Sequence, residues 1–271
     1  MPHTSLISDL HLELAEAPQL NGGDILLLAG DIWTAAHMEN RGAARRRFEA
    51  FCKKELSKYG LVFLVHGNHE YYGSTLEAAP LVIKEFLEEH GPHVVVLDSA
   101  SHTVGGVCFI GSTLWATHGA GDPAAEFRIG EHLTDFRAIR FGDRFPFTPK
   151  TANTLHLKAI AFLKKELAKA RRTGRTCIVI THHAPSFRSK AGRVYELDLD
   201  AAFYSDQEGL IKANPQIALW GHGHSHASCS YRIGETLVVS NQRGYVFSEA
   251  DARFFDPAAA DFILNHYGIA G

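Results

Sequence analysis

The stretch Leu61-Val62-Phe63-Leu64-Val65-His66-Gly67-Asn68-His69-Glu70 shows the pattern that decides the fold, an apolar run that ends in polar side chains. A continuous apolar run of this length is typical of a strand covered on both faces. Other strand-like runs of the chain end in the same way. The polar blocks that follow them are Asp9-Leu10-His11, Gly30-Asp31, Thr181-His182-His183 and Gly223-His224-Ser225-His226.

The segments between these blocks indicate the fold class. In the first third, strand-like runs alternate with stretches of helical spacing, which predicts a mostly parallel sheet with helices on its faces. Short runs joined by Gly-containing turns follow and predict antiparallel hairpins. Residues 116–150 lack clear periodicity and are expected to form a binding loop. The expected helices are 40–59, 76–89 and 151–172, and residues 1–271 are expected to form one domain with two sheets.

The composition excludes several classes of protein. The net charge is −3 with His neutral, so no global field attracts nucleic acid, although a local basic patch could still bind it. The four cysteines form no CxxC pair and are expected to be free thiols. No apolar run approaches the ~20 residues that cross a bilayer. We therefore expect a cytoplasmic protein without a membrane partner, and the sequence does not reveal its oligomeric state.

The polar blocks carry the donor atoms of a metal centre. Carboxylate, amide and imidazole donors without thiolate suit Mn, Fe, Co, Ni or Zn. Alternate side chains of an extended segment share a face, so Asp9 and His11 can reach one ion. His224 and His226 have the same spacing, but a turn between them could direct them to different ions. The two oxygens of one carboxylate can bridge two cations, and Asp31 is the natural candidate.

The position of the polar blocks strengthens their interpretation as a metal site, because ligands of open α/β sheets bind at the carboxyl ends of the strands. All five blocks lie at such ends. Two ions held there could bind a phosphate and lower the pKa of a bridging water. The seven candidate metal ligands are Asp9, His11, Asp31, Asn68, His182, His224 and His226.

The five blocks, in order from residue 9 to 226, resemble the calcineurin-like metallophosphoesterase family. Its pattern is D-x-H, GD, GNH-[DE], a lone His after a strand, and GH-x-H. The stretches 8–13, 67–72 and 181–186 resemble a bacterial, small single-domain branch. His66 and Gln242 stand where many relatives carry Pro, but neither position is a ligand. The resemblance implies an α/β fold, a four-layer αββα sandwich with two mixed sheets.

The resemblance also implies roles for single residues around two divalent metal ions. His69 would lie beside the metals, hydrogen-bond the phosphate and protonate the leaving oxygen. Glu70 would orient His69, and the nucleophile would be a metal-bound hydroxide. One ion would be held by Asp9, His11, Asp31 and His226, and the other by Asp31, Asn68, His182 and His224.

These features favour a phosphoesterase that hydrolyses small phosphodiesters. The alternatives are a phosphomonoesterase, a protein phosphatase or a nuclease of the same family, and a binding scaffold without catalysis. Non-catalytic scaffolds with this fold usually lack some of the metal ligands or the histidine that acts as an acid, and this chain keeps both. His183 could contact substrate or orient a metal ligand. The candidate substrate contacts are His183, Tyr72, His118 and Arg188.

Overall fold

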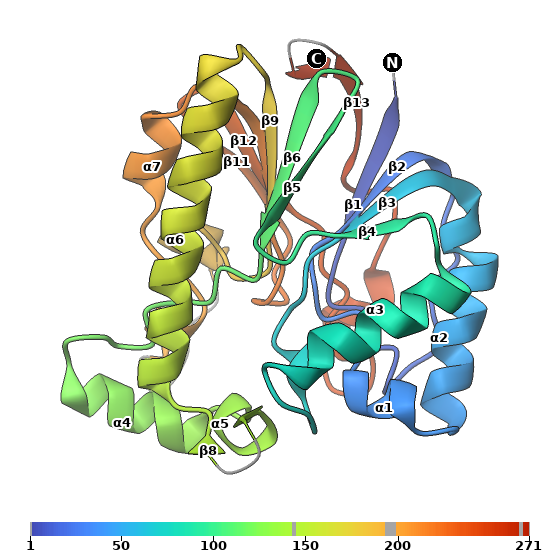
Figure 1. Cartoon of the computed structure of the whole chain (residues 1–271), viewed down its shortest axis with the longest axis vertical. Coiled ribbons are helices and arrows are strands. Elements are labelled where there is room, and N and C mark those ends of the chain that lie inside the picture. The colour runs from blue at the N-terminus through green and yellow to red at the C-terminus, as the bar shows by residue number, and fades with distance from the viewer. Residues whose placement is uncertain (1, 143–144, 193–198, 266–267, 271) are drawn as a thin grey trace.

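Two six-stranded mixed sheets form the middle of the molecule (Figure 1). The computed structural model describes residues 2–142, 145–192, 199–265 and 268–270. The first sheet has the strand order β14-β13-β1-β2-β3-β4 and the second β11-β12-β10-β9-β6-β5. In both sheets four neighbouring strands are parallel, and antiparallel strands lie outside them.

The strands of the first sheet are β1 (His3–Ile7), β2 (Gly23–Leu28), β3 (Tyr59–Leu64), β4 (Val94–Val96), β13 (Asp261–Asn265) and β14 (Gly268–Ala270). Those of the second are β5 (Ala100–Val104), β6 (Val107–Ser112), β9 (Cys177–Thr181), β10 (Ile217–Gly221), β11 (Cys229–Ile233) and β12 (Thr236–Ser240). The helices are α1 (Ala35–Glu39), α2 (Ala43–Lys54), α3 (Ala78–His90), α4 (Pro123–His132), α5 (Asp135–Ala138), α6 (Pro149–Arg172) and α7 (Glu208–Lys212).

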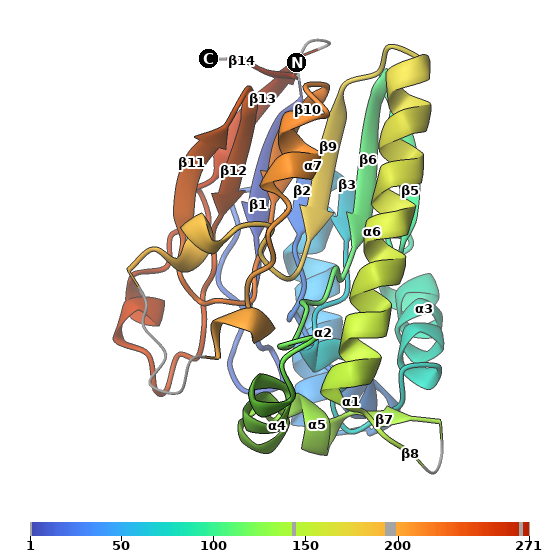
Figure 2. The same cartoon turned by 90° about the vertical axis from the view of Figure 1, so that its left-hand side faces the viewer.

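Three apolar clusters hold the layers together. Between the sheets, Phe63 of β3 stacks on Phe109 of β6 with ring centroids 4.3 Å apart. Helices α1 to α3 cover the outer face of the first sheet, where Phe48 and Phe86 are buried. Helix α6 covers the second sheet through residues such as Leu163 (Figure 2). The expected four-layer α/β sandwich with two mixed sheets is therefore confirmed.

Two expectations need correction: the end of the helix at 40–59, and the interpretation of residues 116–150 as a loop. The helix expected at 40–59 ends at Lys54, and Tyr59 pairs with Gly23 as the first residue of β3. The apolar spacing continues to Tyr59 because the strand also buries that side chain. The stretch 116–150 holds α4, α5 and a short hairpin of β7 (Arg140–Phe141) and β8 (Phe145–Pro146). Residues 143 and 144 lie outside the described part.

The stretch from α4 to β8 packs at one end of the sandwich, below the sheets in Figure 1; we refer to residues 123–146 as the cap. Backbone hydrogen bonds join the cap to the segment after β3, from Gly73 to the Ala138 carbonyl and from Leu76 to the Arg140 carbonyl. The cap therefore has a fixed position over the carboxyl ends of the parallel strands. Every helix in the described ranges is too short or too polar to cross a membrane.

Candidate metal centre

The structure brings all seven predicted metal ligands together at the carboxyl ends of β1, β2, β3, β9 and β10. Four overlapping groups of side chains have ligand atoms within 4.8 Å of one another. Asp31 belongs to two of these groups and Asp9 to two, so the groups form one continuous cluster. The groups are Asp9, His11 and His226; Asp9, Asp31 and His182; His11, Asp31 and His69; and His182, His183 and His224.

Most of these ligands adopt an uncommon backbone conformation. Positive φ angles occur at Asp9 (55°), His11 (46°), Asp31 (55°), His224 (75°) and His226 (50°). Asp and His tolerate this region better than most residues, yet each such position costs about 1 kcal/mol or more. Strained positions of this kind concentrate at functional sites, where the surrounding structure enforces them. Here the sharp turns direct side chains from separate strands into one volume.

Glycine is required beside these ligands because backbone segments approach closely. A Cβ atom on Gly67 would lie 2.1 Å from Asp31 Oδ1, and one on Gly30 would lie 2.5 Å from His182 Nδ1. Any side chain at either position would displace a candidate ligand. The glycines of the Gly30-Asp31 and Gly67-Asn68 blocks therefore serve the packing of the site.

One half of the cluster lies between β1 and the loop after β10. Nε2 of His11 lies 3.1 Å from Nε2 of His226. The same His226 nitrogen is 3.4 Å from Asp9 Oδ1. On the far side of its ring, His226 Nδ1 contacts Glu249 Oε1 at 2.8 Å. A carboxylate behind the ring fixes the orientation in which Nε2 faces the cluster.

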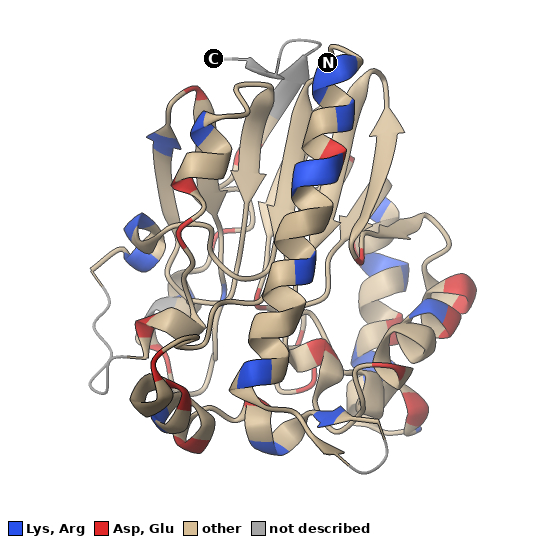
Figure 3. Ribbon diagram, turned by 60° about the vertical axis from the view of Figure 1, so that its left-hand side comes forward, with Lys and Arg blue, Asp and Glu red and all other residues tan. Residues whose placement is uncertain are grey.

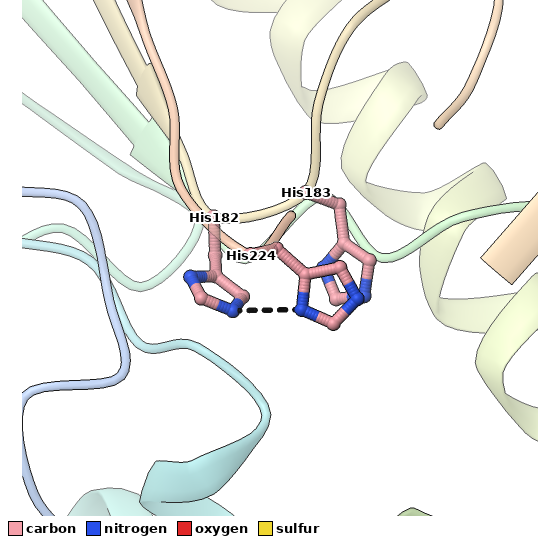
Figure 4. A group of neighbouring side chains, drawn as sticks. All are labelled: His182, His183 and His224. Carbon is pink, nitrogen blue, oxygen red and sulfur yellow. Dashed lines mark hydrogen bonds between the residues drawn. The ribbon is translucent and has the colours of Figure 1, made fainter. Parts of the chain in front are cut away.

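The other half surrounds His182. Its Nε2 lies 2.9 Å from Asn68 Oδ1, 3.1 Å from His224 Nδ1 and 3.3 Å from Asp31 Oδ1. Its Nδ1–H donates to the Ala29 carbonyl at 2.8 Å, which directs Nε2 toward the cluster. Figure 4 shows the rings of His182 and His224 turned toward each other.

This set of nitrogen and oxygen donors could hold metal ions. The ligand atoms of each group lie within 4.8 Å of one another, and a bound ion would take the place of protons on the imidazole nitrogens. The charges in the cluster also suit bound cations. Burial alone would raise the pKa of Asp31, but His182 and His69 hold it well below its usual range. Burial alone would lower the pKa of His182, but Asp31 and Asp9 raise it to about 9. The buried carboxylates thus require positive partners.

His69 lies beside the metal ligands and is held on three sides. Its Nδ1 contacts Glu13 Oε1 at 3.0 Å, and its Nε2 lies 3.0 Å from the hydroxyl of Tyr245. Its ring stacks on Tyr72 with centroids 4.0 Å apart. Burial lowers its pKa, but the charges of Asp31 and Glu13 outweigh that effect and raise it. The surroundings therefore favour a protonated imidazole.

Glu13, and not Glu70, contacts the ring of His69. The carboxylate of Glu70 instead accepts hydrogen bonds from the backbone N–H groups of Asp31, Ile32, Trp33 and Gly67. Adjacent residues direct their side chains apart, which places Glu70 behind the Asp31 loop. Burial and the charge of Asp31 raise its pKa to about 7. Glu70 thus holds the loop that carries Asp31, and the expected contact with His69 is absent from the described structure.

The predicted substrate contacts occupy different places. Tyr72 lines the cavity at the cluster. His183 is fully buried, and its ring lies 4.0 Å from that of His224 (Figure 4). His118 is also buried, and its Nδ1–H donates to the Ala116 carbonyl. Arg188 lies outside this cavity, where it packs over the ring of Tyr231. A role in substrate binding stays a prediction for each of them.

The cavity beside the cluster has a volume of about 260 Å³. The cap forms one wall and the loops after β10 and β12 form the other. Four residues that the sequence interpretation missed lie here or contact a candidate ligand. Glu13 extends the alternation of Asp9 and His11, and that spacing was a usable signal. The missed residues are Glu13, Asp135, Tyr245 and Glu249.

We expect Glu13→Gln to shift the pH dependence of turnover. The carboxylate raises the pKa of His69, so its loss lowers that pKa. An acid acts only while protonated, so the fall of kcat at high pH should move to lower pH. We also expect kcat to fall about tenfold because His69 loses its orienting partner. The measurement is kcat between pH 5 and pH 10. Glu16→Gln, an exposed neighbour, should change neither, and an unmoved profile in Glu13→Gln would contradict this account.

Comparisons with known proteins agree with this geometry. A family model described as calcineurin-like phosphoesterase matches residues 5–228. An uncharacterized protein of Acanthamoeba polyphaga mimivirus is 26% identical over 263 residues, which cover 88% of this chain and 90% of that protein.

Solved structures share the fold at low sequence identity. The phosphopantetheinyl hydrolase PptH of Mycobacterium tuberculosis superposes with a TM-score of 0.66 and 16% identity, over 89% of each chain. A dimetal phosphatase of Danio rerio gives a TM-score of 0.50 and 12% identity, over 88% of this chain and 86% of that one. A putative 5'-nucleotidase of Staphylococcus aureus gives 0.51 and 16% identity, over 89% of this chain and 48% of the other.

Proposed function

Because the chain belongs to the calcineurin-like phosphoesterase family, we propose that it hydrolyses small phosphodiesters with two metal ions held by the cluster of seven ligands. The family itself makes the chain a hydrolase that acts on phosphoric ester bonds. The proposal adds the preference for diesters, the number of ions and the roles of single residues.

The geometry supports a division of the ligands between two ions, with Asp31 shared. Two such ions would lower the pKa of a bound water and offset the charge of a bound phosphate. Asp31 is the suitable bridge because it belongs to groups on both sides of the cluster. One ion is assigned to Asp9, His11, Asp31 and His226, and the other to Asp31, Asn68, His182 and His224.

His69 is assigned the role of proton donor to the leaving oxygen. Its Nε2 faces the cluster, 4.0 Å from Asp31 Oδ2, while Glu13 holds Nδ1 on the other side of the ring. A proton held at Nε2 is thus directed toward the volume in which a phosphate would lie. The hydroxyl of Tyr245 can accept that proton's hydrogen bond before substrate enters.

One observation carries the preference for diesters. Among the described residues that line the cavity there is no Lys or Arg. A phosphomonoester carries up to two negative charges and a polyphosphate more, so their binding gains from cationic side chains beside the metals. A diester carries a single negative charge and has two organic groups. The cavity offers apolar surface from Leu133, Phe203 and Tyr245 to such a group.

The basic side chains within the described ranges lie outside this cavity. Figure 3 shows Lys and Arg along α6, and Lys158, Lys164 and Lys165 of that helix are exposed to solvent. Helix α6 covers the outer face of the second sheet and is not part of the cavity wall. This distribution does not favour a nucleic-acid groove at the metal centre. Single-stranded DNA should therefore leave hydrolysis of a small diester unchanged at moderate salt, and inhibition would support a nuclease.

The test of the proposed function starts from metal-free protein. Hydrolysis of bis(p-nitrophenyl) phosphate and of p-nitrophenyl phosphate is measured after addition of Mn, Fe, Co, Ni or Zn. We expect no turnover without metal, two ions bound per chain, and a higher kcat/KM for the diester. Turnover of the monoester alone would contradict the preference for diesters. A single bound ion at full activity would contradict the dinuclear centre.

A further inference from the structure

Asp135, the first residue of α5 in the cap, contacts two residues of the metal centre. Its side chain is buried, and Oδ1 accepts hydrogen bonds from Asn68 Nδ2 at 2.9 Å and from the Tyr72 hydroxyl at 2.6 Å. Asn68 is an assigned ligand, and the ring of Tyr72 stacks on His69. The cap thus reaches the metal centre through one carboxylate.

The contact with Asn68 decides which end of its amide faces the cluster. The side chain of Asn carries an oxygen, which can bind a cation, and an NH₂ group, which cannot. With Nδ2 held by Asp135, Oδ1 is directed to the other side, 2.9 Å from His182 Nε2. Rotation by 180° about the last side-chain bond would place NH₂ at the ligand position. The Asp135 carboxylate opposes that rotation because it accepts hydrogen bonds and donates none.

The backbone around Asp135 keeps this carboxylate in place. The N–H of Ile139 donates to the Asp135 carbonyl, and the N–H of Arg140 donates to the Ser74 carbonyl. Phe136 stacks on Phe147 with ring centroids 5.5 Å apart. A loosely held side chain could not fix the orientation of a ligand. The Asp135 side chain belongs to a segment that is hydrogen-bonded to the residues following Asn68.

We propose that Asp135 is a positioning residue that locks the Asn68 amide with its oxygen toward the second metal ion. The inference rests on the proposed function in one respect, since it takes Asn68 as a ligand of that ion. It assigns part of the second ion's affinity to the cap, a segment that none of the five sequence blocks includes.

The test is the affinity for Mn²⁺, measured by titration calorimetry on metal-free protein. In Asp135→Ala we expect the second ion to bind about 10- to 100-fold more weakly, the range observed when a group behind a ligand is lost. The affinity of the first ion should stay the same. Asp135→Asn keeps an acceptor oxygen and should lose less, and it serves as the test if the Ala variant does not fold. An equal loss in both variants would overturn the role of an acceptor.

A double-mutant cycle separates this role from a general effect on structure. In Asn68→Asp both terminal atoms of the side chain are oxygens, so rotation of the side chain no longer removes the oxygen that would bind the ion. Asp135→Ala should therefore cost the second ion little affinity in that background. The same loss in both backgrounds would overturn the proposal. Asp122 lies directly before the cap, and its side chain accepts hydrogen bonds from the first backbone N–H groups of α4, so Asp122→Ala is a control that should leave both affinities unchanged.

Different results would overturn the dinuclear centre and the positioning role of Asp135. Wild-type protein that binds one ion would overturn the dinuclear centre and this inference with it. Wild-type protein that binds two ions, with wild-type affinities also in Asp135→Ala, would overturn the inference alone.

Discussion

Replacement of Asp31 by Asn is expected to lower the turnover of bis(p-nitrophenyl) phosphate by about 10³-fold or more while the chain still folds. Asp31 is the carboxylate shared between both halves of the cluster, and its Oδ1 lies 3.3 Å from His182 Nε2. An amide has one oxygen and no charge, so it can neither bridge two cations nor offset their charge. At least one ion should therefore bind poorly.

The fold should tolerate this change because Asn has nearly the same shape. Asp31 Oδ1 accepts a hydrogen bond from the backbone N–H of His69 at 2.9 Å, and an amide oxygen can accept the same bond. Circular dichroism and bound metal should be measured together with kcat. Asp24→Asn is the matched control, since Asp24 is exposed at the opposite end of β2. Turnover near that of the wild type in Asp31→Asn with verified low metal content would refute the proposed chemistry.

The fold and the gathering of the candidate metal ligands at one edge could be predicted because both depend on local sequence patterns. The apolar run of residues 25–29 is short and flanked by glycine, which favours a buried strand, and the polar residue that follows then lies at the strand's end. Parallel pairing then brings such ends to one edge of a sheet. The positive φ angles of Asp9 and Asp31 are the local cost of this arrangement.

The groups behind the ligands could not be predicted in the same way. Asp135 and Glu249 reach the centre from segments without a characteristic pattern, and only the tertiary structure brings Asp135 to Asn68 or Glu249 to His226. Glu70 is a residue for which the sequence led to an incorrect expectation. The family resemblance implied that Glu70 orients His69, whereas the backbone turn directs its carboxylate to the N–H groups of the Asp31 loop.

The last prediction concerns His69→Gln and separates proton donation from other roles. A positioned acid contributes about 10²- to 10⁴-fold to a rate when the leaving group needs a proton. An alkyl alkoxide leaves poorly without one, whereas p-nitrophenolate is stable enough to leave unprotonated. The kcat of His69→Gln should therefore fall by about 10²-fold or more on a dialkyl phosphodiester, in which either leaving group is an alkoxide, and far less on bis(p-nitrophenyl) phosphate.

The ratio of the two losses is the decisive quantity, because a misplaced metal would slow both substrates alike. Gln can still hydrogen-bond Glu13 and Tyr245, so the ring's neighbours keep a partner. His37→Gln, an exposed histidine of α1, should leave both rates unchanged. Equal losses on both substrates would mean that His69 stabilises the bound phosphate and does not protonate the leaving oxygen. A loss confined to the alkyl leaving group would support proton donation by His69, whose Nδ1 contacts Glu13 Oε1 at 3.0 Å.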